Sequence, residues 1–120
     1  MDCIFCKIIA GEIPSRTVYE DDQVLAFHDI EPKAPVHVLV IPKTHIPGAG
    51  AVTQQNSGLV AHVFEVLPQI ARELGVESFR VVTNNGAEAG QTVPHLHFHL
   101  LGGRSMAWPP GLFPAYNENR

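Results

Sequence analysis

The residues best suited to chemistry are the histidines near the carboxyl end. The chain has seven histidines, and three of them alternate with apolar residues in segment 95–101, His-Leu-His-Phe-His-Leu-Leu. In an extended strand alternate side chains point to opposite faces, so the three imidazoles would share one face, with roughly 6–7 Å between successive Cα atoms. Leu96, Phe98 and Leu100 would then face the core. The spacing predicts a row of imidazoles on a rigid strand.

Three interpretations of this row are open. It could be a solvated polar face, but Thr, Lys or Glu would serve equally well there. It could be a metal-centred catalytic site, but no Asp or Glu lies in the strand to complete a hydrolytic centre. We favour nucleophilic catalysis, because imidazole attacks phosphorus effectively and titrates near neutral pH. Such a nucleophile needs one ring nitrogen free and the other held by an acceptor.

A second group of reactive side chains is the pair Cys3 and Cys6. A Cys-x-x-Cys pair is half of a zinc site, and structural zinc takes four nitrogen or sulfur ligands. The alternative is two unpaired thiols in a reducing compartment. The spacing alone leaves both interpretations open.

The elements that must hold these residues follow from periodicity and turn residues. Segment 59–74 has apolar residues at helical spacing; Ser57 can cap its start and Gly75 its end, while Pro68 should kink or restart it. The β-branched run 36–41, ended by Pro42, indicates a buried strand. The remaining expected elements are a short helix over 4–10, strands over 16–20, 23–28, 79–83 and 95–101, and loops over 47–56 and 84–91. Short links between neighbouring strands favour antiparallel pairing, which gives an α+β fold.

Length and charge restrict the function classes. The chain has 120 residues and a formal charge of −4 without a block of Lys or Arg, so we expect one domain that binds no polymeric nucleic acid. No apolar run approaches the roughly 18–20 residues of a membrane span, and no basic stretch leads into a long apolar region as in a signal peptide. We therefore expect a cytoplasmic protein without membrane contact. A chain this short also favours a dimer.

Segment 95–101 resembles the signature of the histidine triad (HIT) family. The flanking segments resemble its Hint branch, and the similarity runs from about residue 4 to residue 111. The matching segments are Phe27-His28-Asp29-Ile30, Pro35 with His37, Val40-Ile41-Pro42-Lys43, His45-Ile46, Gly90-Gln91-Thr92, Gly102-Gly103-Arg104 and Trp108-Pro109-Pro110-Gly111. The sequence departs from the branch at Thr92, where serine is usual, and at Pro94, where an aromatic residue is common; both leave substrate preference open.

The resemblance implies a fold and an activity. The fold would be a HIT domain over residues 1–111, a five-stranded antiparallel sheet with one long and one short helix, followed by a tail over 112–120. Two such sheets would join in a homodimer. The implied activity is that of a purine nucleoside phosphoramidase, which hydrolyses nucleoside 5′-phosphoramidates of the adenosine 5′-monophosphoramidate type through a covalent nucleotidyl-histidine. The alternatives are a dinucleoside polyphosphate hydrolase and a non-catalytic nucleotide-binding interaction protein.

The resemblance also assigns roles to residues. His97 would attack the α-phosphorus, protonated His99 would contact the phosphate and move protons, and His95 and His37 would support the imidazole network. Asp29 would hold the ribose hydroxyls, a chemically sound role for a carboxylate; without the resemblance it could be only a turn residue. The base pocket would comprise Ile4, Phe5, Ile8, Phe27, His28 and Ile30, and the phosphate or leaving-group contacts would be Asn84, Gln91 and Thr92. Trp108 would reach toward the partner's site.

No metal is required for the chemistry that the resemblance implies. Some bacterial HIT proteins nevertheless bind structural zinc, and the matching residues here are Cys3, Cys6, His45 and His95. Such a zinc ion would brace the amino-terminal turn against the triad strand. His62 lies on the main helix outside any motif, and we interpret it as an ordinary surface or hydrogen-bonded histidine.

Overall fold

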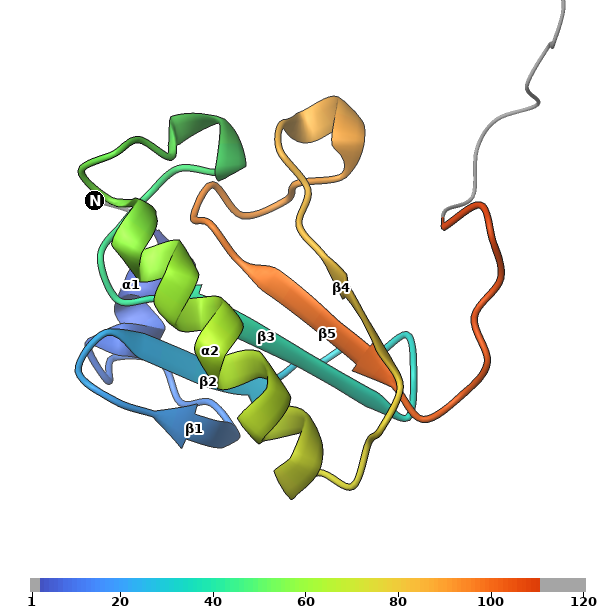
Figure 1. Ribbon diagram of the computed structural model, residues 1–120. Helices are drawn as coiled ribbons and strands as arrows, with labels where there is room; N and C mark the ends of the chain where they lie inside the picture. Colours follow the sequence, from blue (N-terminus) through green and yellow to red (C-terminus); the bar gives the residue numbers. More distant parts are fainter. Residues whose placement is uncertain (1–2, 111–120) are drawn as a thin grey trace, which may run out of the picture.

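The fold consists of one layer of strands with a helix on each of its two sides. The structure is a computed structural model that describes residues 3–110; Gly111 and the expected tail over 112–120 lie outside the described residues. The helices are α1 (Ile4–Ile9) and α2 (Ser57–Glu73), with short 3-10 turns at Ala49–Ala51 and Ala87–Ala89. The strands, shown in Figure 1, are β1 (Thr17–Glu20), β2 (Val24–His28), β3 (Val36–Pro42), β4 (Phe79–Val82) and β5 (Phe98–Gly102).

The strands form one antiparallel sheet in the order β1-β2-β3-β5-β4. The five-stranded antiparallel sheet with two helices confirms the predicted fold class. β3 lies at the centre, and its register places Leu39 opposite His99 and His37 opposite Leu101. Segments 36–42 and 98–102, which are far apart in the sequence, are therefore direct neighbours, and their histidines share one end of the sheet.

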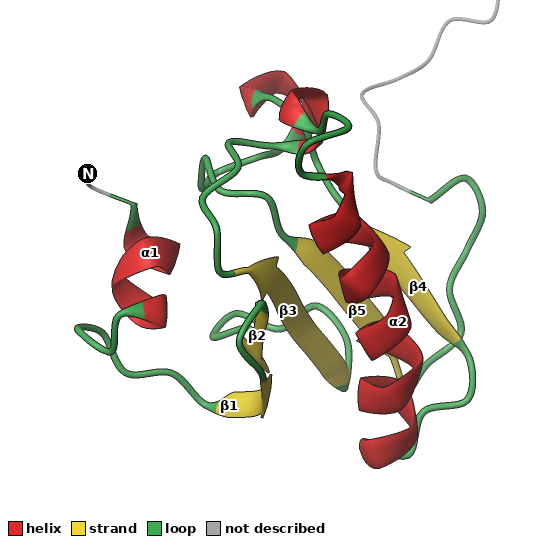
Figure 2. Cartoon of the chain, turned by 60° about the vertical axis from the view of Figure 1, so that its left-hand side comes forward, coloured by secondary structure: helices red, strands yellow, loops and turns green. Residues whose placement is uncertain are grey.

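The two faces of the sheet bury different clusters because side chains alternate along each strand. One face packs against α2, whose apolar side supplies Val63, Leu67 and Ile70 to the main core. Leu96, Phe98 and Leu100 belong to this core, as predicted. The opposite face packs against α1, where Phe5 joins a smaller cluster. Figure 2 shows α1 and α2 on opposite sides of the sheet.

Helix α1 is too short to be stable by itself. It has 6 residues, and isolated helices shorter than about 12 residues are marginal in water. Its attachment to the sheet comes from Cys3 and Phe5, which are both buried against it. The position of α1 therefore depends on a few side chains rather than on a helical stripe.

Two expectations about element boundaries were wrong. The last strand begins at Phe98, not at His95, because the backbone N–H of His95 bonds to the carbonyl of Val93 and that of Leu96 bonds to the carbonyl of Ile46. His95 and His97 thus precede the hydrogen-bonded ladder. Helix α2 starts at Ser57 with Asn56 as its cap, and no side chain bonds at that cap.

Pro68 does not restart helix α2, which runs unbroken through it. Gly75 follows the end of this helix with a φ of +74°, a left-handed conformation that glycine adopts without strain. No helix within residues 3–110 is long and apolar enough to cross a membrane.

Candidate active site

The open end of the face that carries α1 forms a cavity of about 920 Å³, within the usual range for small-molecule sites. Helix α1 walls it on one side, and the triad segment lies on the other. The predicted site residues that line it are Ile4, Phe5, Ile8, Phe27, His28, Asp29, Ile30, His37, Asn84, Thr92, His97 and His99. Most of the predicted site residues therefore lie around one cavity, although they come from separate segments of the chain.

His97 presents a free ring nitrogen to this cavity. Its Nδ1 lies 2.6 Å from the backbone carbonyl oxygen of His95, and a carbonyl can only accept, so Nδ1 carries the proton. In the neutral ring Nε2 is then the unprotonated nitrogen with its lone pair available. The ring is 5% exposed and lines the cavity, and Thr83 anchors the carbonyl of His97 by donating its hydroxyl at 2.8 Å. This is the arrangement that a nucleophilic imidazole needs.

His99 and His37 form a directed hydrogen-bond chain beside His97. The backbone N–H of Lys33 donates to Nδ1 of His37 at 3.0 Å, so the ring proton of His37 lies on Nε2. That Nε2 lies 2.9 Å from Nδ1 of His99 and donates to it. The proton of His99 is thereby placed on Nε2. The ring centroids of His97 and His99 are 5.1 Å apart, which brings this N–H beside the nucleophile.

Both supporting imidazoles are neutral near pH 7. The pKa of His99 is lowered to about 4, first by burial and then by the neighbouring His97 and His37, against the opposing effect of Asp29. Burial also lowers the pKa of His37, against the opposing effect of Asp29. In the ligand-free site His99 therefore offers a neutral N–H donor. The expectation that His99 is protonated during the reaction stays a prediction.

An apolar wall on the α1 side suits a flat ring. The rings of Phe5 and His97 are perpendicular with their centroids 5.1 Å apart, and Phe5 also packs against Phe27 with a centroid distance of 5.6 Å. Ile4, Ile8 and Leu39 complete this wall. Faces and edges of this kind bind aromatic rings through burial and offset stacking.

Asp29 lies at the rim between the apolar wall and the histidines. Its Oδ1 accepts the backbone N–H of Glu31 at 2.8 Å, so it is a turn residue as well as a site residue. Its Oδ2 lies 3.4 Å from Nε2 of His37. A carboxylate in this position can still accept hydrogen bonds from a ligand that enters the cavity.

Three predicted site residues lie elsewhere. His95 is fully buried behind the cavity and contributes its carbonyl, not its ring, to the support of His97. The side chain of Gln91 bonds to backbone groups of Gly86, Pro47 and Val93 and stabilises the loop before the triad. Trp108 is 81% exposed and does not line the cavity within the described part of the chain. Its expected contact with a partner stays a prediction.

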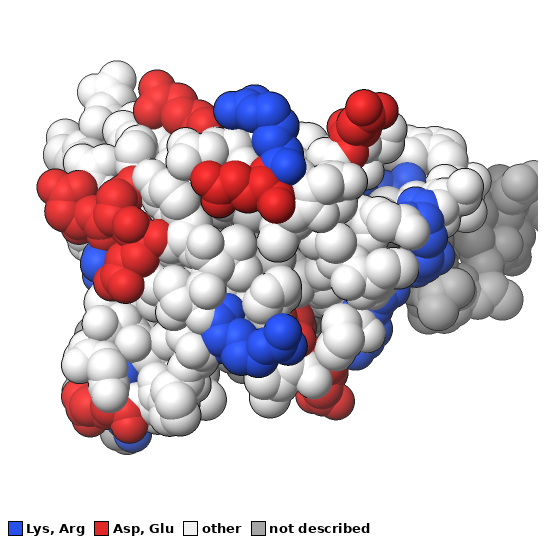
Figure 3. Space-filling view, turned by 90° about the horizontal axis from the view of Figure 1, so that it is seen from below, with Lys and Arg blue, Asp and Glu red and all other residues white. Residues whose placement is uncertain are grey.

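Sequence reasoning missed other lining residues. Arg16 and Lys33 place two cations at the cavity, and Ile13, Val82 and Leu101 add apolar surface. Lys33 belongs to no motif. It donates its backbone N–H to His37, and a pattern of side chains cannot reveal such a contact. On the face seen in Figure 3, basic and acidic side chains are interspersed and do not form one basic patch.

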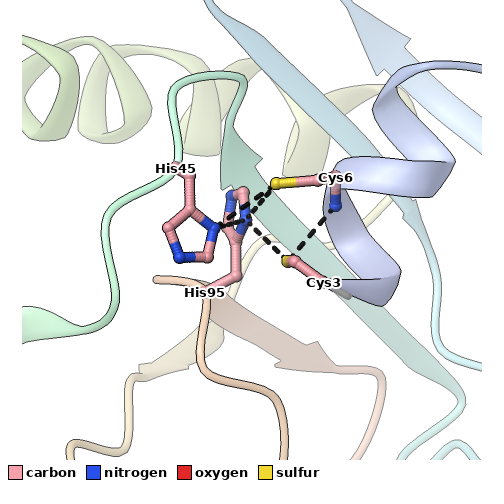
Figure 4. Close-up of side chains that lie close together, drawn as sticks. All are labelled: Cys3, Cys6, His45 and His95. Carbon is pink, nitrogen blue, oxygen red and sulfur yellow. Dashed lines mark hydrogen bonds between the residues drawn. The ribbon is translucent and has the colours of Figure 1, made fainter. Parts of the chain in front are cut away.

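The ring of His95 points away from the cavity into a metal-ligand cluster with Cys3, Cys6 and His45 (Figure 4). Because Nε2 of His95 donates to the carbonyl of Pro42 at 2.9 Å, its Nδ1 has a lone pair that faces the other three residues. This Nδ1 lies 3.3 Å from Sγ of Cys3, 3.6 Å from Sγ of Cys6 and 3.2 Å from Nδ1 of His45.

These spacings fit the edges of a zinc tetrahedron. Bond lengths of about 2.3 Å to sulfur and about 2.0 Å to nitrogen give tetrahedral edges of about 3.3 Å between two nitrogens and about 3.5 Å between nitrogen and sulfur. Two thiols and two imidazoles also form a usual donor set for structural zinc. The four residues therefore fit the ion that the Cys-x-x-Cys pair suggested.

A second group, Asp29, His37 and His99, also brings metal-ligating atoms together. Its hydrogen bonds argue against a metal there. Nδ1 of His37 is occupied by the N–H of Lys33, so Nε2 carries the proton and has no lone pair for an ion. The same contact makes this group a hydrogen-bond chain.

His62 lies on the other face of the sheet, in a cluster that belongs to neither site. Its Nε2 lies 2.7 Å from Oδ2 of Asp21, and its Nδ1 lies 3.3 Å from Oε1 of Glu65. Tyr19 donates its hydroxyl to the same Asp21 oxygen at 2.7 Å. This cluster ties α2 to the turn between β1 and β2, in agreement with a hydrogen-bonded structural histidine.

Comparisons with known proteins agree with this geometry. The family profile described as "HIT domain" matches residues 10–106. An uncharacterised HIT-like protein of Synechocystis is 54% identical over 111 residues, which cover 92% of this chain and 97% of the relative. A protein of Brassica juncea named as a 14 kDa zinc-binding protein is 46% identical over 92% of this chain and 100% of its own length.

Solved structures show the same fold. A HIT family hydrolase from Clostridium thermocellum superposes with a TM-score of 0.87 and is 46% identical, with 88% of this chain and 94% of that chain covered. The match of the family profile to most of the chain and the identity to these relatives lead to one conclusion. The chain belongs to the HIT domain family.

Proposed function

We propose that this protein is a Hint-like purine nucleoside phosphoramidase that works through a nucleotidyl intermediate on His97. The observation that carries the proposal is the bond from Nδ1 of His97 to the carbonyl of His95, which leaves Nε2 as a nucleophile inside the cavity. The name of the Clostridium thermocellum relative, a HIT family hydrolase, is in line with hydrolysis.

Different parts of the cavity lining suit the base, the ribose and the phosphate of a nucleotide. The purine ring lies against Phe5 and Phe27, and the carboxylate of Asp29 accepts the ribose hydroxyls. The α-phosphate then lies over His97 and His99, with Asn84 and Thr92 beside it. Donors that are already in place at a developing negative charge are the largest source of rate acceleration in many enzymes.

The reaction takes two displacements. Nε2 of His97 forms a bond to phosphorus while the bond from phosphorus to the amine breaks. The bound phosphate favours the charged form of the imidazole of His99. His99 takes up this proton from solvent at Nδ1, and the hydrogen bond from His37 to that nitrogen opens when it does. Charged His99 then gives the proton of its Nε2 to the leaving amine. Water then attacks phosphorus, returns a proton to His99, and releases nucleoside monophosphate and neutral His97. A zinc ion held by Cys3, Cys6, His45 and His95 would brace the fold and supply none of these steps.

We also propose a homodimer, because a pocket this open on one side gains burial from a second copy, and the large apolar side chain of Trp108 is exposed in the single chain. We place the protein in the cytoplasm and the HIT domain within residues 1–111. Sedimentation at micromolar concentration tests the dimer, and a monomer would contradict a shared active site.

A substrate panel tests the activity. Adenosine and guanosine 5′-phosphoramidates, the matching dinucleoside polyphosphates and a pyrimidine phosphoramidate are compared by kcat/KM. The proposal expects purine phosphoramidates to be hydrolysed fastest. Faster turnover of dinucleoside polyphosphates would assign the alternative hydrolase activity, and tight nucleotide binding without turnover would assign an interaction protein.

A further inference from the structure

The proposed nucleophile, His97, lies outside the hydrogen-bonded part of the sheet. β5 begins at Phe98, so His95 and His97 receive no ladder hydrogen bonds from β3. Loop backbone is normally mobile unless other contacts fix it. A residue whose ring must stay within a few tenths of an ångström of its productive position needs such contacts.

The contacts that fix this segment converge on His95. Its ring is fully buried and reaches Pro42 at the end of β3 through Nε2 at 2.9 Å. Its Nδ1 faces Cys3, Cys6 and His45. Its carbonyl accepts the Nδ1 proton of His97 at 2.6 Å. One residue therefore joins the metal-ligand cluster to the nucleophile.

His45 clamps the same segment from the other side. The next residue, Ile46, accepts the backbone N–H of Leu96 at 2.6 Å, and Nδ1 of His45 lies 3.2 Å from Nδ1 of His95. His45 does not line the cavity and touches none of the groups assigned to substrate. Any effect of His45 on turnover must therefore pass through the neighbours of its ring, which are His95 at 3.2 Å and Cys6 at 3.4 Å.

We propose that His45 is a positioning residue for His97: together with Cys3 and Cys6 it holds His95 through a shared zinc ion, and the carbonyl of His95 then fixes the tautomer and direction of the nucleophile. This inference rests on the proposed function for its kinetic test only. The metal site would then affect the rate of the reaction as well as the stability of the fold. No step of the chemistry would take place on the metal.

Two substitutions of His45 separate the loss of a zinc ligand from the loss of side-chain volume. His45→Ala removes a ligand, whereas His45→Cys keeps a four-ligand set that zinc also accepts. Zinc content per chain, the ¹⁵N shifts of the His97 ring, kcat and KM are measured for both variants in the zinc-loaded full chain. Val63→Ala, a core change on the α2 face, is the control for lost stability without a lost ligand.

The inference expects His45→Ala to lose zinc, to show a mixture of His97 tautomers, and to lower kcat by about 10–100-fold, as is usual when the support of a metal site is removed. KM should change less than kcat, because Asp29 is not part of the cluster and Phe5 keeps its packing against Phe27. His45→Cys should restore zinc, the single tautomer and most of kcat. Val63→Ala should lower the melting temperature without changing the tautomer.

The inference is overturned if His45→Ala loses zinc but keeps the His97 tautomer and kcat, or if Val63→Ala reproduces the loss of kcat. If the wild-type protein hydrolyses no phosphoramidate, the proposed function fails by itself. The ¹⁵N measurement then still decides the inference, since an unchanged tautomer in zinc-free His45→Ala overturns it.

Discussion

Histidines on the two faces of the sheet have opposite surroundings. On the α1 face, His99 is partly buried among other imidazoles, and its pKa is lowered to about 4 by burial first and then by His97 and His37. On the α2 face, the hydrogen bond to the Asp21 carboxylate raises the pKa of His62, and Glu65 adds to this effect. The first environment favours a neutral ring that can exchange a proton, whereas the second favours the charged form of a ring that is paired with a carboxylate. The residue type is shared, and the environment decides between chemistry and structure.

The largest expected difference between the histidines of the two faces is at His97, the proposed nucleophile. His97→Ala should lower turnover by about 10³-fold or more, because a lost nucleophile has no substitute in the cavity. Affinity for adenosine monophosphate should change little, since the base and ribose contacts stay. Single-turnover kinetics and calorimetry measure the two quantities. A variant that kept more than about a tenth of the wild-type rate, the size of a weak acid–base effect, would disprove the assignment of the nucleophile.

Asp29 should affect binding more than chemistry. Asp29→Asn keeps the Oδ1 contact to Glu31 but removes the charge, and charge-assisted bonds to the ribose are worth about 1.5–3 kcal/mol, or about 10–100-fold in affinity. The matched comparison is adenosine monophosphate against its 2′-deoxy form. The wild-type protein should prefer the ribose form, and the variant should prefer it less. An equal preference in both proteins would leave Asp29 as a turn residue only.

The pH dependence of stability should differ between the two faces, and His99 gives the larger effect. The ordinary histidine pKa is about 6.5, so the unfolded chain binds more protons than the folded chain between about pH 6.5 and the lowered value in the folded protein. The free energy of unfolding should therefore fall by about 1–3 kcal/mol as the pH drops through this window. Urea unfolding at several pH values measures it. His99→Gln should flatten the profile; an unchanged slope would show that His99 is not responsible.

His62 should give a smaller effect of opposite sign. Its folded pKa is raised by Asp21, so its contribution is fully present below about pH 6.5 and is lost as the pH rises through the raised pKa. His62→Gln should therefore cost about 1 kcal/mol at pH 6, a usual value for a partly exposed ion pair, and less at pH 9. Turnover should be unchanged. A cost that grew with pH would contradict the charged pairing.

The pair of His62 and Asp21 also affects the stability of the fold at acid pH. Burial alone would raise the pKa of Asp21, but hydrogen bonds from His62, Tyr19 and two backbone N–H groups lower it well below its usual range. This contribution to stability is present above an ordinary pKa of about 3.9 and is lost only as the pH falls below it. The α2 cluster therefore stabilises the fold most in mildly acidic solution.

Much of this organisation could be predicted from the sequence. Alternation along 95–101 placed Leu96, Phe98 and Leu100 in the core correctly, because burial of one face is decided by side-chain period. The Cys-x-x-Cys pair, together with the histidines that the family resemblance supplied, gave the ligand cluster that the structure brings together. Helical spacing located α2 to within two residues at its start.

What the sequence could not give depends on backbone contacts. The backbone N–H of His95 bonds to Val93 and that of Leu96 bonds to Ile46, so the strand begins only after His97. No residue pattern encodes these two backbone contacts. The same is true of the Lys33 N–H that fixes the tautomer of His37. Gln91 was expected at the phosphate, but its amide satisfies loop backbone groups, a demand that becomes visible only when the loop is folded.

The central claim is that Nε2 of His97 becomes bonded to phosphorus during turnover. Rapid quenching of the protein with adenosine 5′-phosphoramidate, followed by alkaline digestion and mass spectrometry, tests this most directly, because phosphorus bonded to histidine nitrogen is lost in acid. The account predicts an adenylyl group on the peptide that contains His97, bonded at Nε2, with none in His97→Ala. An adenylyl group on His99 or on any other residue, or full turnover with no adenylylated peptide at any quench time, would contradict it.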